Sequence, residues 1–174
     1  MENNIREQEA KYREYIDNHR ANVQKAWYNM KTNSRCMELI TRELNTSTDA
    51  AISLIDELVE KHDLSKYEKE EFDTYRRYFY PVNDEEKEAS KVAFDRAWKH
   101  HYDLNPHHWD YWYHTGQMNN MGMAFCIEEV CDWIAMGYQF NNTAIEWYMK
   151  NSHNIHLGEK QRWFTEELLN AFYR

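Results

Sequence analysis

A long amphipathic stripe at the start of the chain constrains its fold more than any other feature. From about Ile5 to Met30, apolar and aromatic residues recur at spacings of three and four, the period of one helix face. His19 lies within this stripe, so its side chain is expected to face inward. Only four glycines and two prolines occur in 174 residues, which disfavours a β architecture with many turns. The chain is therefore predicted to be all-α.

The same periodicity predicts further helices along the chain. We expect them at 34–44, 48–62, 69–79, 83–102, 120–136, 142–150 and 158–173, with 107–115 as a turn or short helix. Ser47 or Thr48 is expected to cap one of them, and Asn83 with Glu86 resembles a capping box. Gly137 is expected to close the helix over 120–136. The sequence thus predicts a single domain over residues 1–174, a bundle of about six to eight helices.

Composition limits the function classes. Aromatic residues make up 16% of the chain, with seven Trp and thirteen Tyr, so the core should be rich in rings. The net charge of −9 disfavours a duplex nucleic acid as partner. The three cysteines, Cys36, Cys126 and Cys131, form no CxxC pair and indicate a reducing compartment. No apolar run is long enough to span a membrane, and the N-terminus lacks a signal pattern. We expect a cytoplasmic protein, and the aromatic content would permit a homodimer.

Seven side chains of metal-ligand type lie on at least four separate segments: His19, His62, Asp63, His101, His107, His108 and Asp132. Imidazole nitrogen and carboxylate oxygen suit divalent iron, manganese, zinc, cobalt or nickel. The absence of cysteine from the set disfavours a structural zinc knuckle. Two ions about 3.5–4 Å apart would polarise a phosphoryl oxygen and generate hydroxide near neutral pH. The sequence therefore predicts one or two divalent transition-metal ions.

Several of these residues have a structural alternative. His19 alone would be read as a core histidine hydrogen-bonded to a neighbour. His62 and Asp63 would be a helix C-terminal cation and a loop carboxylate. Adjacent helix residues point about 100° apart, so only one of His100 and His101 can face a metal. His101 continues the apolar stripe of its helix, which leaves His100 as an exposed or supporting imidazole with a candidate catalytic role.

The remaining candidates are a histidine pair and two carboxylates. His107 and His108 follow a proline, where each can bind one ion or one can contact the substrate. Asp132 is expected to be buried among apolar neighbours, so it needs a metal or a basic partner. Glu128, one turn earlier, either orients a histidine as part of the catalytic machinery or is a solvated helix residue.

Basic and aromatic side chains suggest a substrate. Lys66 is a candidate for holding a phosphate or carboxylate oxygen, as are Arg76 and Arg77, whose alternative is a surface pair among acidic residues. The aromatic residues near the histidine pair either wall the core or stack a nucleobase; they are Trp98, Trp109, Tyr111, Trp112 and Tyr113.

Five motifs carry a resemblance to a known family. They are HRANV around His19, HDLSKYxxxEF at 62–72, FDRAWxHH at 94–101, NPHHW at 105–109 and EVCDWI at 129–134. On these motifs the chain resembles, from about residue 10 to 170, a family of bacterial and phage proteins defined as a domain of unknown function.

A deeper resemblance is to the HD superfamily of metal-dependent phosphohydrolases, whose ligand order H, HD, H, HH, D is similar. It implies an HD-like helical fold, the seven ligands above, and Lys66 beside the phosphate. The segment Trp109–Trp112 departs from the Gly-Tyr-Pro of the cyclic-dinucleotide phosphodiesterase branch, so that substrate is not implied.

The resemblance therefore predicts hydrolysis of a small phosphorylated substrate, a nucleotide or another phosphate ester. The alternatives are an HD-type di-iron oxygenase and a non-catalytic phage or bacterial binding protein.

Overall fold

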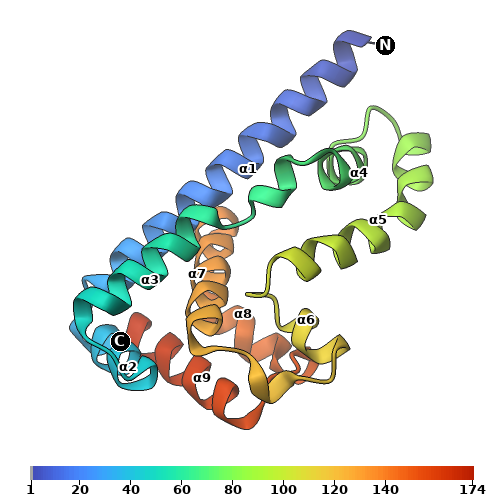
Figure 1. Ribbon diagram of the computed structural model, residues 1–174. Coiled ribbons are helices and arrows are strands. Elements are labelled where there is room, and N and C mark those ends of the chain that lie inside the picture. Colours follow the sequence, from blue (N-terminus) through green and yellow to red (C-terminus); the bar gives the residue numbers. More distant parts are fainter. Residues whose placement is uncertain (1) are drawn as a thin grey trace. The chain divides into compact units, whose positions relative to one another are not determined.

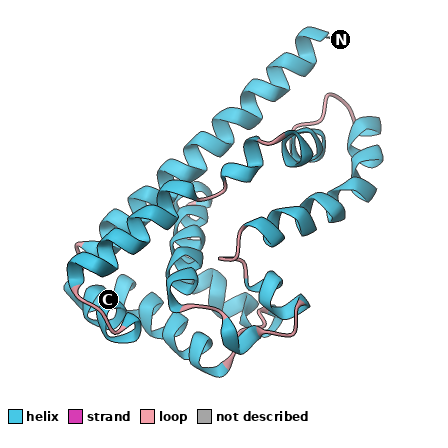
Figure 2. Cartoon of the chain, in the orientation of Figure 1, coloured by secondary structure: helices cyan, strands magenta, loops and turns pink. Residues whose placement is uncertain are grey.

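The computed structural model describes residues 2–174, and within that range helices and loops account for the whole backbone, with no strand (Figure 2). The α-helices are α1 (Glu2–Lys31), α2 (Ser34–Leu44), α3 (Thr48–Lys61), α4 (Lys69–Phe79), α5 (Asp84–Leu104), α6 (Trp109–His114), α7 (Met123–Phe140), α8 (Ala144–Asn151) and α9 (Glu159–Tyr173). Three short 3₁₀ turns join them: η1 (Leu64–Tyr67), η2 (Met118–Asn120) and η3 (Ser152–Asn154). The all-α prediction is confirmed.

Helix starts follow the expected capping chemistry. The Ser47 side chain accepts a hydrogen bond from Ala50 N and caps α3. The Asn83 side chain accepts from Glu86 N at 2.8 Å and caps α5. Glu86, in turn, accepts from Val82 N at 2.8 Å. These side chains satisfy backbone donors that the first turn of a helix leaves unpaired.

The prediction that Gly137 closes a helix is wrong. Helix α7 continues to Phe140, and Asn141, with a φ of 53°, takes the left-handed position at its end. Gly137 lies inside the helix at a close approach, because a Cβ on it would stand 2.8 Å from Asn142 O. The glycine is therefore explained by contact between the end of α7 and the following turn.

Substituting Gly137 by alanine is expected to destabilise the fold, because the new methyl group would displace the backbone at Asn142. Overpacking of this kind costs about 1–3 kcal/mol. Thermal unfolding followed by circular dichroism measures it. Gly122→Ala is the matched control, since a Cβ there would meet the Phe125 ring at an ordinary 3.6 Å. Equal melting temperatures for the two variants would contradict the expectation.

The described chain divides into two compact units. The first unit takes the chain up to Asn18 together with Asp63–Asn105, and the second unit takes His19–His62 with Pro106–Arg174. Neither unit is one continuous segment, so no single cut of the chain separates them. Each has its own hydrophobic core.

The second unit is built around α7, which contacts α2, α3, α8 and α9. Figure 1 shows α7 beside α3. Ten of the 18 residues of α7 are buried. Its apolar members Ile127, Val130 and Ile134 are fully buried with residues of α1, α2, α3 and α9. A helix buried on most sides brings its polar residues into the interior as well, and Glu128, Glu129 and Asp132 all lie there.

The first unit has a smaller, aromatic core. Tyr12 and Ile16 of α1 pack with Phe72 and Tyr75 of α4 and with Ala97 of α5. The Tyr12 and Phe72 ring centroids are 5.0 Å apart. Helices α4 and α5 pack against each other and against η1. The expectation of a ring-rich core is met here.

The three cysteines are free and buried. Burial raises the pKa of Cys36 to about 11, and burial also raises the thiol pKa values of Cys126 and Cys131. We therefore expect almost no reaction with a disulfide reagent at pH 8 in the native protein and three reactive thiols after denaturation. Rapid reaction of even one thiol in the native protein would contradict this.

Within residues 2–174, no helix combines the length and the apolar character needed to cross a bilayer.

Candidate metal centre

Three elements of the second unit bring histidines and carboxylates together. His19 lies on α1, and His62 is the residue that ends α3. Glu128 and Asp132 lie one turn apart on α7, so their side chains share one face. The Arg20 side chain fixes the end of α3, since its Nε donates to His62 O at 2.8 Å and its NH2 donates to Glu60 O at 2.6 Å. The backbone at His62 is thus held by a cation at a helix C-terminus.

His19, His62 and Asp132 form a buried triad of potential ligands. The Nε2 atoms of His19 and His62 are 3.3 Å apart. His19 Nε2 is also 3.1 Å from Asp132 Oδ1. The two imidazoles are 2% and 1% exposed, so a cation held between them would be largely shielded from solvent.

This triad fits one divalent ion. Two donors that each lie about 2.1 Å from the same ion are roughly 3.0–3.4 Å apart at octahedral or tetrahedral angles. The measured separations of 3.3 and 3.1 Å fall in that range. Two imidazoles and one carboxylate are a donor set that divalent transition metals accept. The triad could hold a metal without large side-chain movement.

Glu128 orients two imidazoles at once. Its Oε1 lies 3.0 Å from His62 Nδ1 and 3.2 Å from His107 Nδ1. A carboxylate acceptor at Nδ1 places the ring proton there and leaves Nε2 as the ligand nitrogen. Since His62 Nε2 faces His19, Glu128 points the unprotonated nitrogen of His62 into the triad. His62, His107 and Glu128 also form a second potential ligand group, which shares His62 with the first.

The two neighbouring glutamates of α7 differ in charge. Burial raises the pKa of Glu128, but the adjacent His107 and His62 outweigh burial and hold that pKa below its usual 4.5. Burial raises the pKa of Glu129 well above 4.5, and nearby Asp132 raises it further. Glu128 is therefore an ionised acceptor, whereas Glu129 favours its neutral form.

The histidine pair starts the segment that leads into α6. The ring centroids of His107 and His108 lie 4.2 Å apart, and the ring centroids of His107 and His62 lie 4.4 Å apart. His107 is buried. Glu129 Oε1 accepts a hydrogen bond from Trp109 N at 3.1 Å, which anchors the segment on α7. His107 therefore belongs to the cluster, and His108 lies beside it.

A separate histidine–carboxylate network lies in the first unit. Glu71, fully buried on α4, is within 2.9 Å of His100 Nδ1 and 2.8 Å of His101 Nδ1. Burial raises the pKa of Glu71, but hydrogen bonds from His101, His100 and Ser65 outweigh it and lower that pKa overall. His101 Nε2 then lies 3.3 Å from Asp63 Oδ1. The preference for His101 as the inward histidine is supported, because it is fully buried whereas the side chain of His100 is 39% exposed.

Lys66 and Asp63 form an ion pair in the first unit. Lys66 Nζ is 2.5 Å from Asp63 Oδ2. Asp63 has a φ of 57°, in the left-handed region that Asn and Asp adopt more readily than other non-glycine residues, and it directly precedes η1. Lys66 is thus held by a carboxylate, and its predicted contact with a phosphate stays a prediction.

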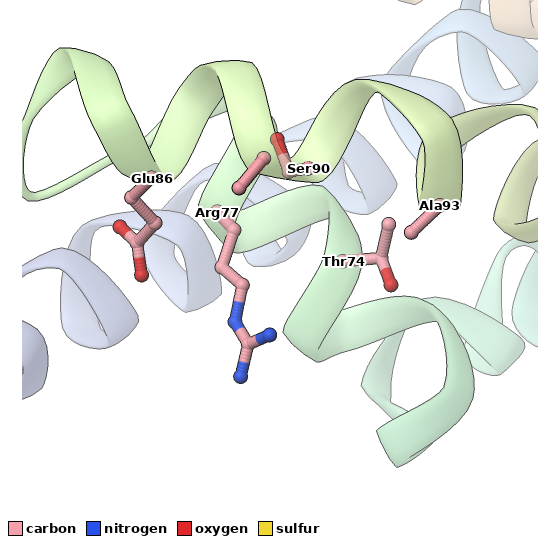
Figure 3. Close-up of a pocket in the computed structure, with 6 residues that line it drawn as sticks. Thr74, Arg77, Glu86, Ser90 and Ala93 are labelled. Carbon is pink, nitrogen blue, oxygen red and sulfur yellow. The ribbon is translucent and has the colours of Figure 1, made fainter.

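A hollow between α4 and α5 offers no metal ligand set (Figure 3). It encloses about 140 Å³ and is lined by Thr74, Arg77, Glu86, Ala89, Ser90 and Ala93. Arg76 NH1 and NH2 each approach one carboxylate oxygen of Glu86 at 2.8 Å. Arg76 is 5% exposed, so the alternative that it forms a surface ion pair with acidic residues is wrong. Arg77 is exposed, as that alternative expects.

Five of the ten predicted site residues gather in one cluster in the second unit: His19, His62, His107, Glu128 and Asp132. Asp63, Lys66, His100 and His101 belong to the first-unit network. That all seven predicted ligands bind the same ions stays a prediction. The sequence motifs do not reveal the role of Glu71, the glutamate of HDLSKYxxxEF, because it stands beside Glu70 and near Asp73 in an acidic stretch.

These features define an all-α protein with a candidate metal centre. The chain matches the family described as "Family of unknown function (DUF5662)" over residues 8–171 and belongs to that family. The predicted resemblance to a domain of unknown function is confirmed, and the comparisons contain no link to the HD superfamily. No curated protein and no solved structure matches the chain.

Proposed function

We propose that this protein is a metal-dependent phosphohydrolase that acts on a nucleotide or another small phosphate ester. The observation that carries the proposal is the buried triad of His19, His62 and Asp132, with donor separations of 3.1 and 3.3 Å. Glu128 supports it, because a carboxylate at His62 Nδ1 prepares Nε2 for ligation. The ligand order that resembles the HD superfamily also favours this class of reaction.

A divalent ion in the triad would supply Lewis-acid polarisation of a phosphoryl oxygen and a more acidic attacking water. His19, His62 and Asp132 would hold and shield it. Glu128 would keep His62 in the required tautomer. Lys66 and His100 lie in the first unit, so a contact of Lys66 with a phosphate and proton donation by His100 to a leaving oxygen stay predictions from the sequence.

Turnover by the reconstituted protein tests the proposal. Metal-depleted protein is loaded with Mn²⁺ or Fe²⁺ and incubated with nucleoside mono-, di- and triphosphates and with model phosphodiesters. We expect release of phosphate or nucleoside monophosphate by wild-type protein and by Tyr28→Ala, whose side chain is 61% exposed on α1. His62→Ala should lose activity. Equal rates for wild type and His62→Ala would refute the proposal.

The triad also favours a second candidate, an oxygenase that uses iron. Two histidines and one carboxylate are the ligand set of many non-haem Fe(II) oxygenases. Oxygen consumption separates the two functions. Iron-loaded protein that consumes O₂ with an organic substrate and leaves all phosphate esters intact would support the oxygenase.

A further inference from the structure

Two segments of the second unit carry no charged side chains of their own, although Arg162 of α9 donates to Ser152 O at 3.4 Å and to Ile155 O at 2.5 Å. Residues 111–127 and 151–158 contain no Asp, Glu, Lys or Arg, although 29% of the chain is charged. The first segment includes most of α6 together with η2, and the second includes η3 and the turn before α9. Both lie near the label α6 in Figure 1. The exposed side chains of these two segments are uncharged, so on a chain of net charge −9 they are better suited to a neutral ligand group than to a phosphate.

An aromatic stack joins the two segments. The rings of Tyr113 and His156 lie 4.2 Å apart at an interplanar angle of 16°. Trp109 approaches the same histidine edge-on at 5.4 Å. Tyr113 is 41% exposed, and His156 is exposed as well. The stack is therefore a ring surface that solvent can reach.

The surroundings of the stack are fixed and rich in amides. Buried Gln161 donates to Asn119 O and Met121 O, each at 2.9 Å, which holds the loop around η2. Gly158 lies so close to Asn119 that a Cβ would collide with its side chain. Gln117, Asn119 and Asn120 are exposed beside this contact. Side-chain amides both donate and accept hydrogen bonds, as the edges of nucleobases do.

The stack follows the histidine pair directly. His108 precedes α6, and Trp109 N is anchored by Glu129, which adjoins Glu128 on α7. With a rise of 1.5 Å per residue, Tyr113 lies about 6 Å along the helix axis from Trp109. Tyr113 follows His107 of the candidate metal centre by six residues in the same segment.

We infer that the Tyr113–His156 stack binds the nucleobase of the substrate. A planar, uncharged ring with hydrogen-bonding edges matches the aromatic faces, the amide rim and the lack of charge. The inference rests on the proposed function for its choice of a nucleotide as substrate class. It adds a specific base-binding surface and assigns a role to His156.

Nucleoside binding tests the surface without requiring hydrolysis. Saturation-transfer difference NMR measures adenosine, guanosine, cytidine and uridine binding to the full-length protein. We expect at least one nucleoside to bind wild-type protein, with affinity about tenfold weaker in Tyr113→Ala. Tyr113→Phe should retain binding because it keeps the ring. Tyr28→Ala, at a tyrosine 61% exposed on α1, is the control and should bind as wild type does.

The outcomes separate this inference from the proposed function. Equal binding to wild type and Tyr113→Ala overturns the base-binding surface. Failure of all four nucleosides to bind does the same and would favour a protein partner at this surface. Nucleoside binding as expected, without hydrolysis of any nucleotide or model phosphodiester, would leave the surface standing and refute the hydrolase.

Discussion

Replacing His62 by alanine is expected to remove metal binding, with an increase in the dissociation constant of more than about 100-fold. His62 belongs to both potential ligand groups that lie within the second unit, so its loss affects each of those two. Loss of a residue that only orients a ligand typically costs 10–100-fold, and loss of the ligand itself should exceed that range. Inductively coupled plasma mass spectrometry of purified protein, together with titration of metal-depleted protein, measures the effect.

Variants that each remove a donor from one ligand group show which group holds the metal. His19→Ala removes a donor from the group with Asp132, and His107→Ala removes one from the group with Glu128. If one ion occupies the His19 group, His19→Ala should lose it and His107→Ala should keep it. If each group holds an ion, either variant should retain one. His153→Ala, at an exposed histidine, should match wild type.

A metal content unchanged in His62→Ala would contradict the candidate centre. Circular dichroism distinguishes loss of ligation from loss of fold, because His62 is buried. His62→Gln is a second variant that keeps a polar side chain of similar length. A folded His62→Gln protein that binds metal as wild type does would also count against the site.

Helix periodicity predicted the fold and the inward direction of several site residues. His19 lies in a stripe whose apolar members are buried, and the structure buries His19 with them at 2% exposure. Asp132 was expected to need a partner, and His19 lies 3.1 Å from it. Such inferences succeed because the period of 3.6 residues determines which side chains share a face.

Contacts between distant segments could not be predicted in this way. Glu71 directly follows Glu70 and precedes Phe72, so local pattern alone allowed a surface position. Its burial depends on His100 and His101, about 30 residues later. Gly137 was misassigned for a related reason, since only the backbone at Asn142 shows that a side chain is excluded there.

Substitution of Glu128 is expected to weaken metal binding strongly as well, because its carboxylate positions His62 and His107. Glu128→Gln should raise the metal dissociation constant about 10–100-fold. The oxygen of a neutral amide is a weaker acceptor than the ionised carboxylate oxygen Oε1, which faces both His62 Nδ1 and His107 Nδ1. An amide nitrogen turned toward His62 would also favour the wrong tautomer, with the proton on Nε2.

The comparison of Glu128→Gln with Glu128→Leu separates positioning from structural support. Leucine leaves two buried imidazole donors without their carboxylate, which should lower the free energy of unfolding by about 1–3 kcal/mol for each lost partner. Glutamine retains the shape and most of the hydrogen bonding, so its melting temperature should stay near that of wild type. A weaker metal affinity in a Glu128→Gln protein of unchanged stability would identify a positioning residue. Unchanged affinity would show that His62 keeps its ligand nitrogen without Glu128.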